Sequence, residues 1–320
     1  MGKITRLAVL GFLFCFNSLL LPQNLQGQVS GVKTIPGDYN SITDAMSQIR
    51  IAGVSGPTFL ELQPGYNSAV ETYPITIRAI PGISSTNSLT ISPAAGVTGL
   101  SIITASSSPV INFIGAYNII IDGRPGRAGT ARELTILNNG VESNAVSFTD
   151  GAVDNAVRYC VLESSPLTLF NAVVYFGRSG EPLPVNIFFE NSGNELSECA
   201  VRTINSSIAI YSNGGQDVYN TGNKIINNEI MDFRRHGIAM FNFNSNWLIT
   251  GNSFYSQGLV SASDISIIHF GGAIPGSVNN TISGNFIGGQ SLHAAGTKFN
   301  AEYVHGILLV DGSFIVENNI

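Results

Sequence analysis

The chain has 320 residues, a formal net charge of −6 and only 11% charged residues. An acidic protein without a basic run is a poor partner for nucleic acid, because neutralisation of phosphates by Lys and Arg dominates that affinity. Few charges together with abundant Gly, Asn, Ser, Ile and Val are typical of a protein built from β-strands that bury one face.

The first residues have the features of a secretory signal peptide. Lys3 and Arg6 precede an apolar run from Leu7 to Leu21, which Pro22 and a polar stretch follow. The run is too short and wrongly flanked for a membrane anchor, so we expect cleavage near Gly27 and removal of residues 1–27. No second run is long enough to cross a bilayer, which predicts a secreted or cell-surface protein without a transmembrane segment in the mature chain.

Residues 28–99 are expected to form an N-terminal cap and the first coils of the domain that follows. The segment from Ser41 to Asp44 resembles a helix capping box, and one face of the helix after it carries Ile42, Ala45, Met46 and Ile49. Such a helix would shield the open edge of the first strands. Residues 58–62 and 75–77 have the pattern of those strands, and residues 113–115 and 118–123 that of one or two less regular coils.

Residues 100–320 carry two interleaved patterns. The first is an aliphatic residue, then Asn or Cys three positions later, then a hydrophobic residue two further. Its six copies lie 24 to 39 residues apart: Val157-x-x-Cys160-x-Leu162, Leu196-x-x-Cys199-x-Val201, Ile225-x-x-Asn228-x-Ile230, Ile249-x-x-Asn252-x-Phe254, Ile282-x-x-Asn285-x-Ile287 and Ile315-x-x-Asn318-x-Ile320. The second pattern, apolar-x-apolar, alternates with it: Val146/Phe148, Val174/Phe176, Ile208/Ile210, Ile238/Met240, Ile265/Ile267 and Ile307/Leu309.

These alternating patterns predict an all-β fold, a single-stranded right-handed parallel β-helix with an N-terminal helical cap. Side chains two residues apart share a strand face, and coils stacked at about 4.8 Å would place like residues on like. Asn228, Asn252, Asn285 and Asn318 would then form a column at one corner, where Asn tolerates left-handed backbone and its amide bonds the neighbouring coils. Cys160 and Cys199 continue this column, either as a disulfide or as stacked free thiols.

The chain resembles pectate-lyase-like β-helix proteins over residues 32–320. The resemblance is carried by the segment from Thr34 to Tyr39, the helix after it, the strand that leads to Pro64-Gly65-Tyr66, and the Asn-bearing repeats. The chain is also similar to the N-terminal part of large bacterial cell-surface β-helix proteins that carry a C-terminal sorting domain. Because the last repeat stops at Ile320 in the middle of a strand, we expect the sequence to be truncated there.

Two sets of residues are candidates for chemistry. Arg235, His236, Asp264 and His305 fall near equivalent turns, and a His–Asp–His group beside a guanidinium suits binding or deprotonation of a sugar acid; they also fit a solvated polar turn. In the pectate-lyase-like family, acids cluster on neighbouring coils. Here Asp150 and Asp311 are five coils apart, roughly 24 Å, which argues against that activity. We expect no cofactor and no metal site.

Aromatic residues mark the second candidate site. Tyr175, Tyr211, Phe241, Phe243 and Phe270 are expected to project from neighbouring coils of one sheet, with Asn242 beside them. Such a strip suits stacking against pyranose faces, unless loops fold over and bury it. The sequence therefore favours a non-catalytic surface protein that binds glycan or acts as an adhesin. The alternatives are a polysaccharide lyase or hydrolase, and a structural spacer for missing C-terminal domains.

Overall fold

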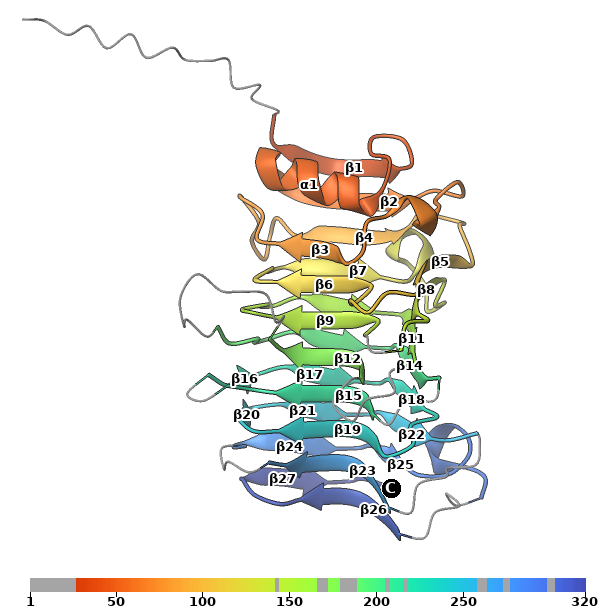
Figure 1. The fold of residues 1–320 in the computed structure, drawn as a ribbon, viewed down its shortest axis with the longest axis vertical. Helices are drawn as coiled ribbons and strands as arrows, with labels where there is room; N and C mark the ends of the chain where they lie inside the picture. The colour runs from red at the N-terminus through yellow and green to blue at the C-terminus, as the bar shows by residue number, and fades with distance from the viewer. Residues whose placement is uncertain are drawn as a thin grey trace, which may run out of the picture.

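The structure, a computed structural model, describes residues 27–141, 144–165, 172–178, 189–204, 208–215, 218–257, 264–272, 277–297 and 303–320. The expected signal peptide lies outside these residues, except for Gly27. The described chain winds into a column of stacked strands with one helix at its N-terminal end (Figure 1). Every named strand pairs in parallel with its neighbours, so the fold is a parallel β-helix.

Three long sheets form the sides of the column within the described residues. Sheet A consists of β1 (Val29–Ile35), β2 (Val54–Leu62), β4 (Leu89–Pro93), β7 (Ile119–Asp122), β10 (Ala156–Arg158), β13 (Glu195–Ser197), β17 (Lys224–Ile226), β21 (Leu248–Thr250), β24 (Asn280–Ser283) and β27 (Phe314–Glu317). Sheet C consists of β5 (Leu100–Thr104), β8 (Leu134–Asn138), β11 (Cys160–Ser164), β14 (Ala200–Thr203), β18 (Glu229–Met231), β22 (Ser253–Tyr255) and β25 (Phe286–Ile287).

Sheet B is the third side and carries the candidate site. Its strands are β3 (Ile75–Arg78), β6 (Ile111–Ile114), β9 (Val146–Thr149), β12 (Ala172–Gly177), β15 (Ile208–Asn213), β19 (His236–Phe241), β23 (Asp264–Gly271) and β26 (Tyr303–Leu309). From β4 onward each coil visits sheets A, C and B in turn, and parallel crossovers of this kind are right-handed. A short pair, β16 (Asn220–Thr221) and β20 (Asn244–Ser245), extends the corner between sheets B and A.

The cap helix α1 (Ile42–Ala52) forms as the sequence predicts. Ser41 caps it by accepting the backbone N–H of Asp44, and Ile42, Ala45, Met46 and Ile49 form its buried face. The carboxylate of Glu71 adds a second cap, because it accepts the N–H groups of Ile42 and Thr43 at 2.7 and 2.8 Å. An anion at this end of a helix is stabilised by the helix dipole.

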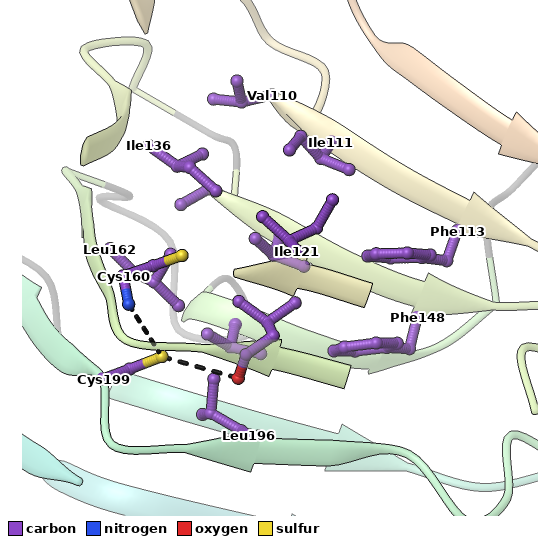
Figure 2. Packing of buried hydrophobic residues seen from close by; sticks show 14 of the residues in the cluster. Val110, Ile111, Phe113, Ile121, Ile136, Phe148, Cys160, Leu162, Leu196 and Cys199 are labelled. Atoms are coloured by element: carbon purple, nitrogen blue, oxygen red, sulfur yellow. Dashed lines mark hydrogen bonds between the residues drawn. The ribbon is translucent and has the colours of Figure 1, made fainter. Parts of the chain in front are cut away.

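The core consists of ladders of like residues stacked along the axis. Ile121, Val157 and Leu196 stack in sheet A, and Ile136, Leu162 and Val201 in sheet C, all fully buried. In sheet B the rings of Phe113, Phe148 and Phe176 lie nearly parallel, with centroids 4.9 and 4.7 Å apart. Figure 2 shows the rings of Phe113 and Phe148 one above the other, opposite the aliphatic side chains of the other two sheets.

Buried side chains bridge the coils at both ends of the sheet A strands. The corner between sheets A and C carries Cys160, Cys199, Asn228, Asn252, Asn285 and Asn319, which we call the A–C ladder. Each Asn accepts the backbone N–H of the ladder residue one coil before it, at 2.9 to 3.0 Å. A second series, missed in the sequence, lies at the corner between sheets B and A and includes Asn155, Asn194, Asn223 and Asn280.

The prediction that Asn318 belongs to this ladder is wrong by one residue. β27 pairs with β24 through Ile282 and Val316, so Asn319 lies on Asn285. Asn318 occupies the preceding column, whose members all have a left-handed backbone: Tyr159, Glu198, Asn227, Gly251, Gly284 and Asn318. Of the two predicted reasons for Asn in the ladder, amide bonding to the neighbouring coils is confirmed. The left-handed backbone is wrong, because it falls on the preceding residue and leaves the ladder side chain free to point inward.

Cys160 and Cys199 lie one coil apart as free thiols. The Cys160 N–H and the Val157 carbonyl oxygen each lie 3.5 Å from Cys199 Sγ, the contacts that an Asn amide makes elsewhere in the ladder (Figure 2). Burial, and then the neighbouring Cys199, raise the pKa of the Cys160 thiol well above its ordinary value. Both thiols therefore act here as small apolar members of the ladder.

Candidate binding groove on sheet B

Some strands of sheet B contain a bend where two consecutive side chains point inward. Val173 and Val174 in β12 both belong to the buried core, as do Ile267 and Ile268 in β23. Alternation resumes after the bend, with Val174, Ile210, Ile238 and Ile268 in register. The next outward positions on these four strands are therefore Tyr175, Tyr211, Ala239 and His269.

Five rings form a continuous aromatic strip on the outer face of sheet B: Tyr175, Tyr211, Phe241, His269 and His236. Successive ring centroids are 5.8, 5.7, 5.5 and 5.0 Å apart in that order. The Tyr211 ring is only 6% exposed and packs with Ala172, Ile208 and Ala239 in a small apolar cluster that is separate from the core, while Tyr175 and Phe241 lie partly buried against this cluster. The strip crosses β12, β15, β19 and β23 and so runs along the axis of the solenoid.

Glycines allow two of these side chains to lie against the sheet. A Cβ at Gly177 would overlap the hydroxyl of Tyr175, and one at Gly271 would overlap the imidazole of His269. The Tyr175 hydroxyl also accepts the backbone N–H of Arg178 at 3.1 Å. These contacts fix the orientation of the Tyr175 ring.

A groove of about 630 Å³ lies beside the strip on the same face. Its aromatic half is formed by Tyr175, Tyr211 and Phe241, together with Arg178, Asn213 and Asn242. Its polar half is formed by side chains from earlier coils: Ser107, Pro109, Asn112, Asn144, Ser147 and Thr149. The groove thus combines ring surfaces with hydroxyl and amide groups, which is the composition of a site that fixes a polar ligand with apolar faces.

Hydrogen bonds within and between coils hold the polar side chains in place. Thr149 donates to Asn112 Oδ1 at 3.0 Å, and Ser147 donates to Asn144 Oδ1 at 3.2 Å. Asn242 donates to Asn213 Oδ1 at 3.0 Å at the other end. Side chains that are ordered before binding lose less conformational freedom when a ligand arrives.

The two tyrosine rings of the groove remain uncharged at physiological pH. Burial, and then the neighbouring Tyr175, raise the pKa of Tyr211 to about 12. Burial likewise raises the pKa of Tyr175. Of the described residues that line the groove, Arg178 alone carries a formal charge at neutral pH.

The predicted aromatic residues separate into two groups. Tyr175, Tyr211 and Phe241 lie together as expected, with Asn242 in the groove beside them. The outward placement of Phe270 is wrong, because it pairs with Met240 and is fully buried, edge-on to Phe314. Ile265 and Ile267 are buried as predicted, but Ile268 and Phe270 are buried as well and pair with Ile238 and Met240, so His269 takes the outward position.

Phe243 also lies away from the strip. It follows β19 with a left-handed backbone, is 7% exposed and packs edge-on against Tyr219. The prediction treats Phe241 and Phe243 as two outward positions of one strand, whereas β19 ends at Phe241. The chain turns the corner there, which directs Phe243 toward the turn.

The predicted catalytic residues do not assemble into one compact group. The Nδ1 atom of His236 lies 2.9 Å from the carbonyl oxygen of Ser266, which occupies the coil between His236 and His305. The two histidines are thus two coils apart, about 10 Å. Arg235 is exposed before β19, and the side chain of Asp264 lies outside the described part of the structure. Among the described residues no cluster of three His, Cys, Asp or Glu side chains is close enough to hold a metal ion.

Several residues were not predicted from the sequence as part of the site: His269 in the aromatic strip, and Arg178, Asn112, Ser147, Thr149 and Asn213 in the groove. All of these except Arg178, which is four residues after Val174, lie one or three residues after the last inward residue of the bend. That signal requires the bend to be recognised. Two adjacent apolar residues, such as Val173-Val174 and Ile267-Ile268, mark it in some of the strands.

In the described residues no helix is both long and apolar enough to cross a membrane. No family model matches the sequence, and no curated protein is similar to it. Among solved structures, the fold is similar to a mutant of the periplasmic alginate epimerase AlgG, with a TM-score of 0.36 and 14% identity over 81% of this chain. It is also similar to PfbA, a surface adhesin of Streptococcus pneumoniae, with a TM-score of 0.32 and 14% identity over 78% of this chain. The chain spans 60% and 67% of these two structures, and the likeness concerns the fold alone.

Proposed function

We propose that this protein is an exported β-helix protein that binds a polysaccharide chain in the groove on sheet B. The observation that supports the proposal is the aromatic strip beside a row of amide and hydroxyl groups. Pyranose rings have apolar C–H faces and a rim of hydroxyls. The partly exposed rings of Tyr175 and Phe241 match the faces, and ordered Asn, Ser and Thr side chains match the rim.

The shape of the site supports a long ligand. The groove and strip continue over consecutive coils along a straight axis, with no change of sheet. A polysaccharide is extended in the same way and gains affinity from many weak contacts. The same geometry suits an adhesin-like role, in which a rigid column at the cell surface presents one face to a glycan.

Affinity electrophoresis through gels that contain neutral or acidic polysaccharides tests this proposal. We expect retention on at least one polymer, and loss of most of that retention in Tyr175→Ala. Phe59→Ala is the matched control, since Phe59 is a half-buried aromatic on the outer face of sheet A. Absence of retention on every polymer, or equal retention by both variants, would contradict glycan binding at this site. Cleavage of the retained polymer would contradict a non-catalytic role.

Export is the second part of the proposal. The basic residues and apolar run within residues 1–27 support removal of this segment, which leaves a cap region (28–99) and a repeat region (100–320). Mass spectrometry of the protein recovered outside the cytoplasm is expected to place its N-terminus within a few residues of Gln28. Recovery of the intact chain from the cytoplasm alone would contradict export.

A further inference from the structure

The charges around the groove restrict the chemistry of its ligand. Arg178 at one edge is the one charged residue among the described groove-lining side chains, and the whole chain has a net charge of −6. Asp150 lies next to Arg178 in a smaller hollow that adjoins the groove. The groove therefore presents a nearly neutral surface on an acidic protein.

Arg78 at the end of β3 and the exposed Arg234 and Arg235 just before β19 lie at the borders of sheet B, outside the groove lining. Other basic residues lie on other sides of the column. Arg158 pairs with Asp122 on sheet A, Arg202 lies between Glu163 and Asp232 on sheet C, and Lys224 belongs to sheet A. Among the described side chains that line the groove, a polyanion with a charge on each unit would thus meet one cation, Arg178.

The groove also has a defined length in units of the repeat. Its lining comes from five consecutive strands of sheet B, with Asn112 in β6, Ser147 in β9, Tyr175 in β12, Tyr211 in β15 and Phe241 in β19. Four strand spacings give a length of about 19 Å. The length of one sugar in a linear β-linked chain is close to one strand spacing, so each coil can hold one sugar.

We infer that the ligand is a neutral, linear glycan that lies parallel to the solenoid axis with one sugar per coil. The inference rests on the proposed function and specifies its ligand class. Sugars on β12 and β19 stack on Tyr175 and Phe241, the sugar on β15 lies over the exposed edge of Tyr211, and those on β6 and β9 bond to the Asn, Ser and Thr side chains. A carboxylate on every sugar would lose its hydration in this groove without gaining a cationic partner, which is costly.

Calorimetric titration with matched ligands tests this inference. The ligands are a soluble linear neutral β-glucan and the same polymer oxidised to carboxylates at its primary alcohols. We expect the oxidised polymer to bind at least roughly tenfold more weakly. Neutral oligosaccharides of increasing length should gain affinity up to about five units and then reach a plateau.

Salt and one substitution provide independent readouts. Binding of the neutral polymer should change little between low and high salt, because screening acts on charge pairs. Arg178→Gln should weaken it by less than roughly threefold, a fraction of a kcal/mol, since the backbone N–H that holds Tyr175 remains. Tighter binding of the oxidised polymer, loss of affinity in high salt, or a large effect of Arg178→Gln would overturn the neutral ligand class while leaving glycan binding intact. If neither polymer nor any glycan of the panel binds, the proposed function fails as well.

Discussion

At the residue scale, glycine and tyrosine act as a unit in the groove. Gly177 occupies an outward strand position, and Tyr175 lies across it, held by the Arg178 N–H. A residue with any side chain at position 177 would lift the ring from the sheet. The phenol oxygen is the distal atom of a flexible side chain, so it can move without disturbing the core.

Gly177→Ala should therefore weaken glycan binding without unfolding the protein. Displacement of one stacking ring costs about 1 kcal/mol, or roughly a fivefold rise in Kd. Calorimetric titration and thermal unfolding measure the two effects separately. Gly56→Ala is the matched control, because this sheet A strand glycine leaves an ordinary 3.4 Å contact for a new methyl group. An unchanged Kd in Gly177→Ala would show that the ring orientation does not matter.

The A–C ladder depends on amide groups that are satisfied on two coils at once. Asn252 accepts both the backbone N–H and the Nδ2–H of Asn228, and it donates to the Ile225 carbonyl. Cys199 shows that a thiol can replace an amide in the ladder, with longer contacts of 3.5 Å.

Asn252→Ala should lower the free energy of unfolding by about 2–4 kcal/mol, because it leaves buried polar groups of Asn228 and Ile225 without partners. Chemical denaturation measures the loss. Asn227→Gly, at the exposed left-handed position one coil away, should cost much less because glycine adopts that backbone readily. Equal losses in the two variants would refute the role assigned to the ladder.

At the scale of the element, one bend decides which side of β23 faces solvent. Ile267 and Ile268 both point inward at the bend, so Phe270 enters the core and His269 joins the aromatic strip. Strict alternation without this bend would place Phe270 outside and His269 inside, because a shift of one residue exchanges the two faces of a strand.

Phe270→Ala and Phe241→Ala are accordingly expected to have opposite effects. Phe270→Ala creates a cavity in the core and should cost about 3–5 kcal/mol of stability, whereas Phe241→Ala removes a half-exposed ring and should chiefly weaken binding. Denaturation curves and Kd values for both variants test the register of β23. Greater destabilisation by Phe241→Ala than by Phe270→Ala would contradict it.

At the scale of the whole molecule, burial of phenols and thiols predicts loss of stability in alkali. Burial is the main cause that raises the pKa of Tyr73, Tyr211 and Tyr255 to about 12, and it also raises that of Cys160. A group whose pKa is higher in the folded state holds its proton more tightly there. Its contribution is complete below the unfolded pKa and is lost as pH rises through the folded one.

The thermal unfolding temperature should therefore fall as the pH rises above about 8.5, the ordinary thiol pKa. It should fall more steeply between about pH 10 and 12, where the tyrosines of the unfolded chain ionise before those of the folded protein. Tyr255→Phe should make this fall shallower, while Tyr303→Phe, which alters an exposed side chain, should not. An unfolding temperature that stays constant up to pH 12 would exclude this explanation.

The sequence by itself determined the architecture of this protein. The repeated aliphatic and Asn or Cys positions predicted the parallel β-helix, the corner ladder to within one residue at Asn318, and the cap helix with its Ser41 cap. These features follow from spacing along a strand, which the sequence records directly. Only the tertiary structure decided the groove, because two consecutive inward residues at each bend set which side chains face out. It therefore placed His269, Ser147 and Thr149 outside and Phe270 inside, and it brought together side chains from five coils that the sequence separates by variable loops.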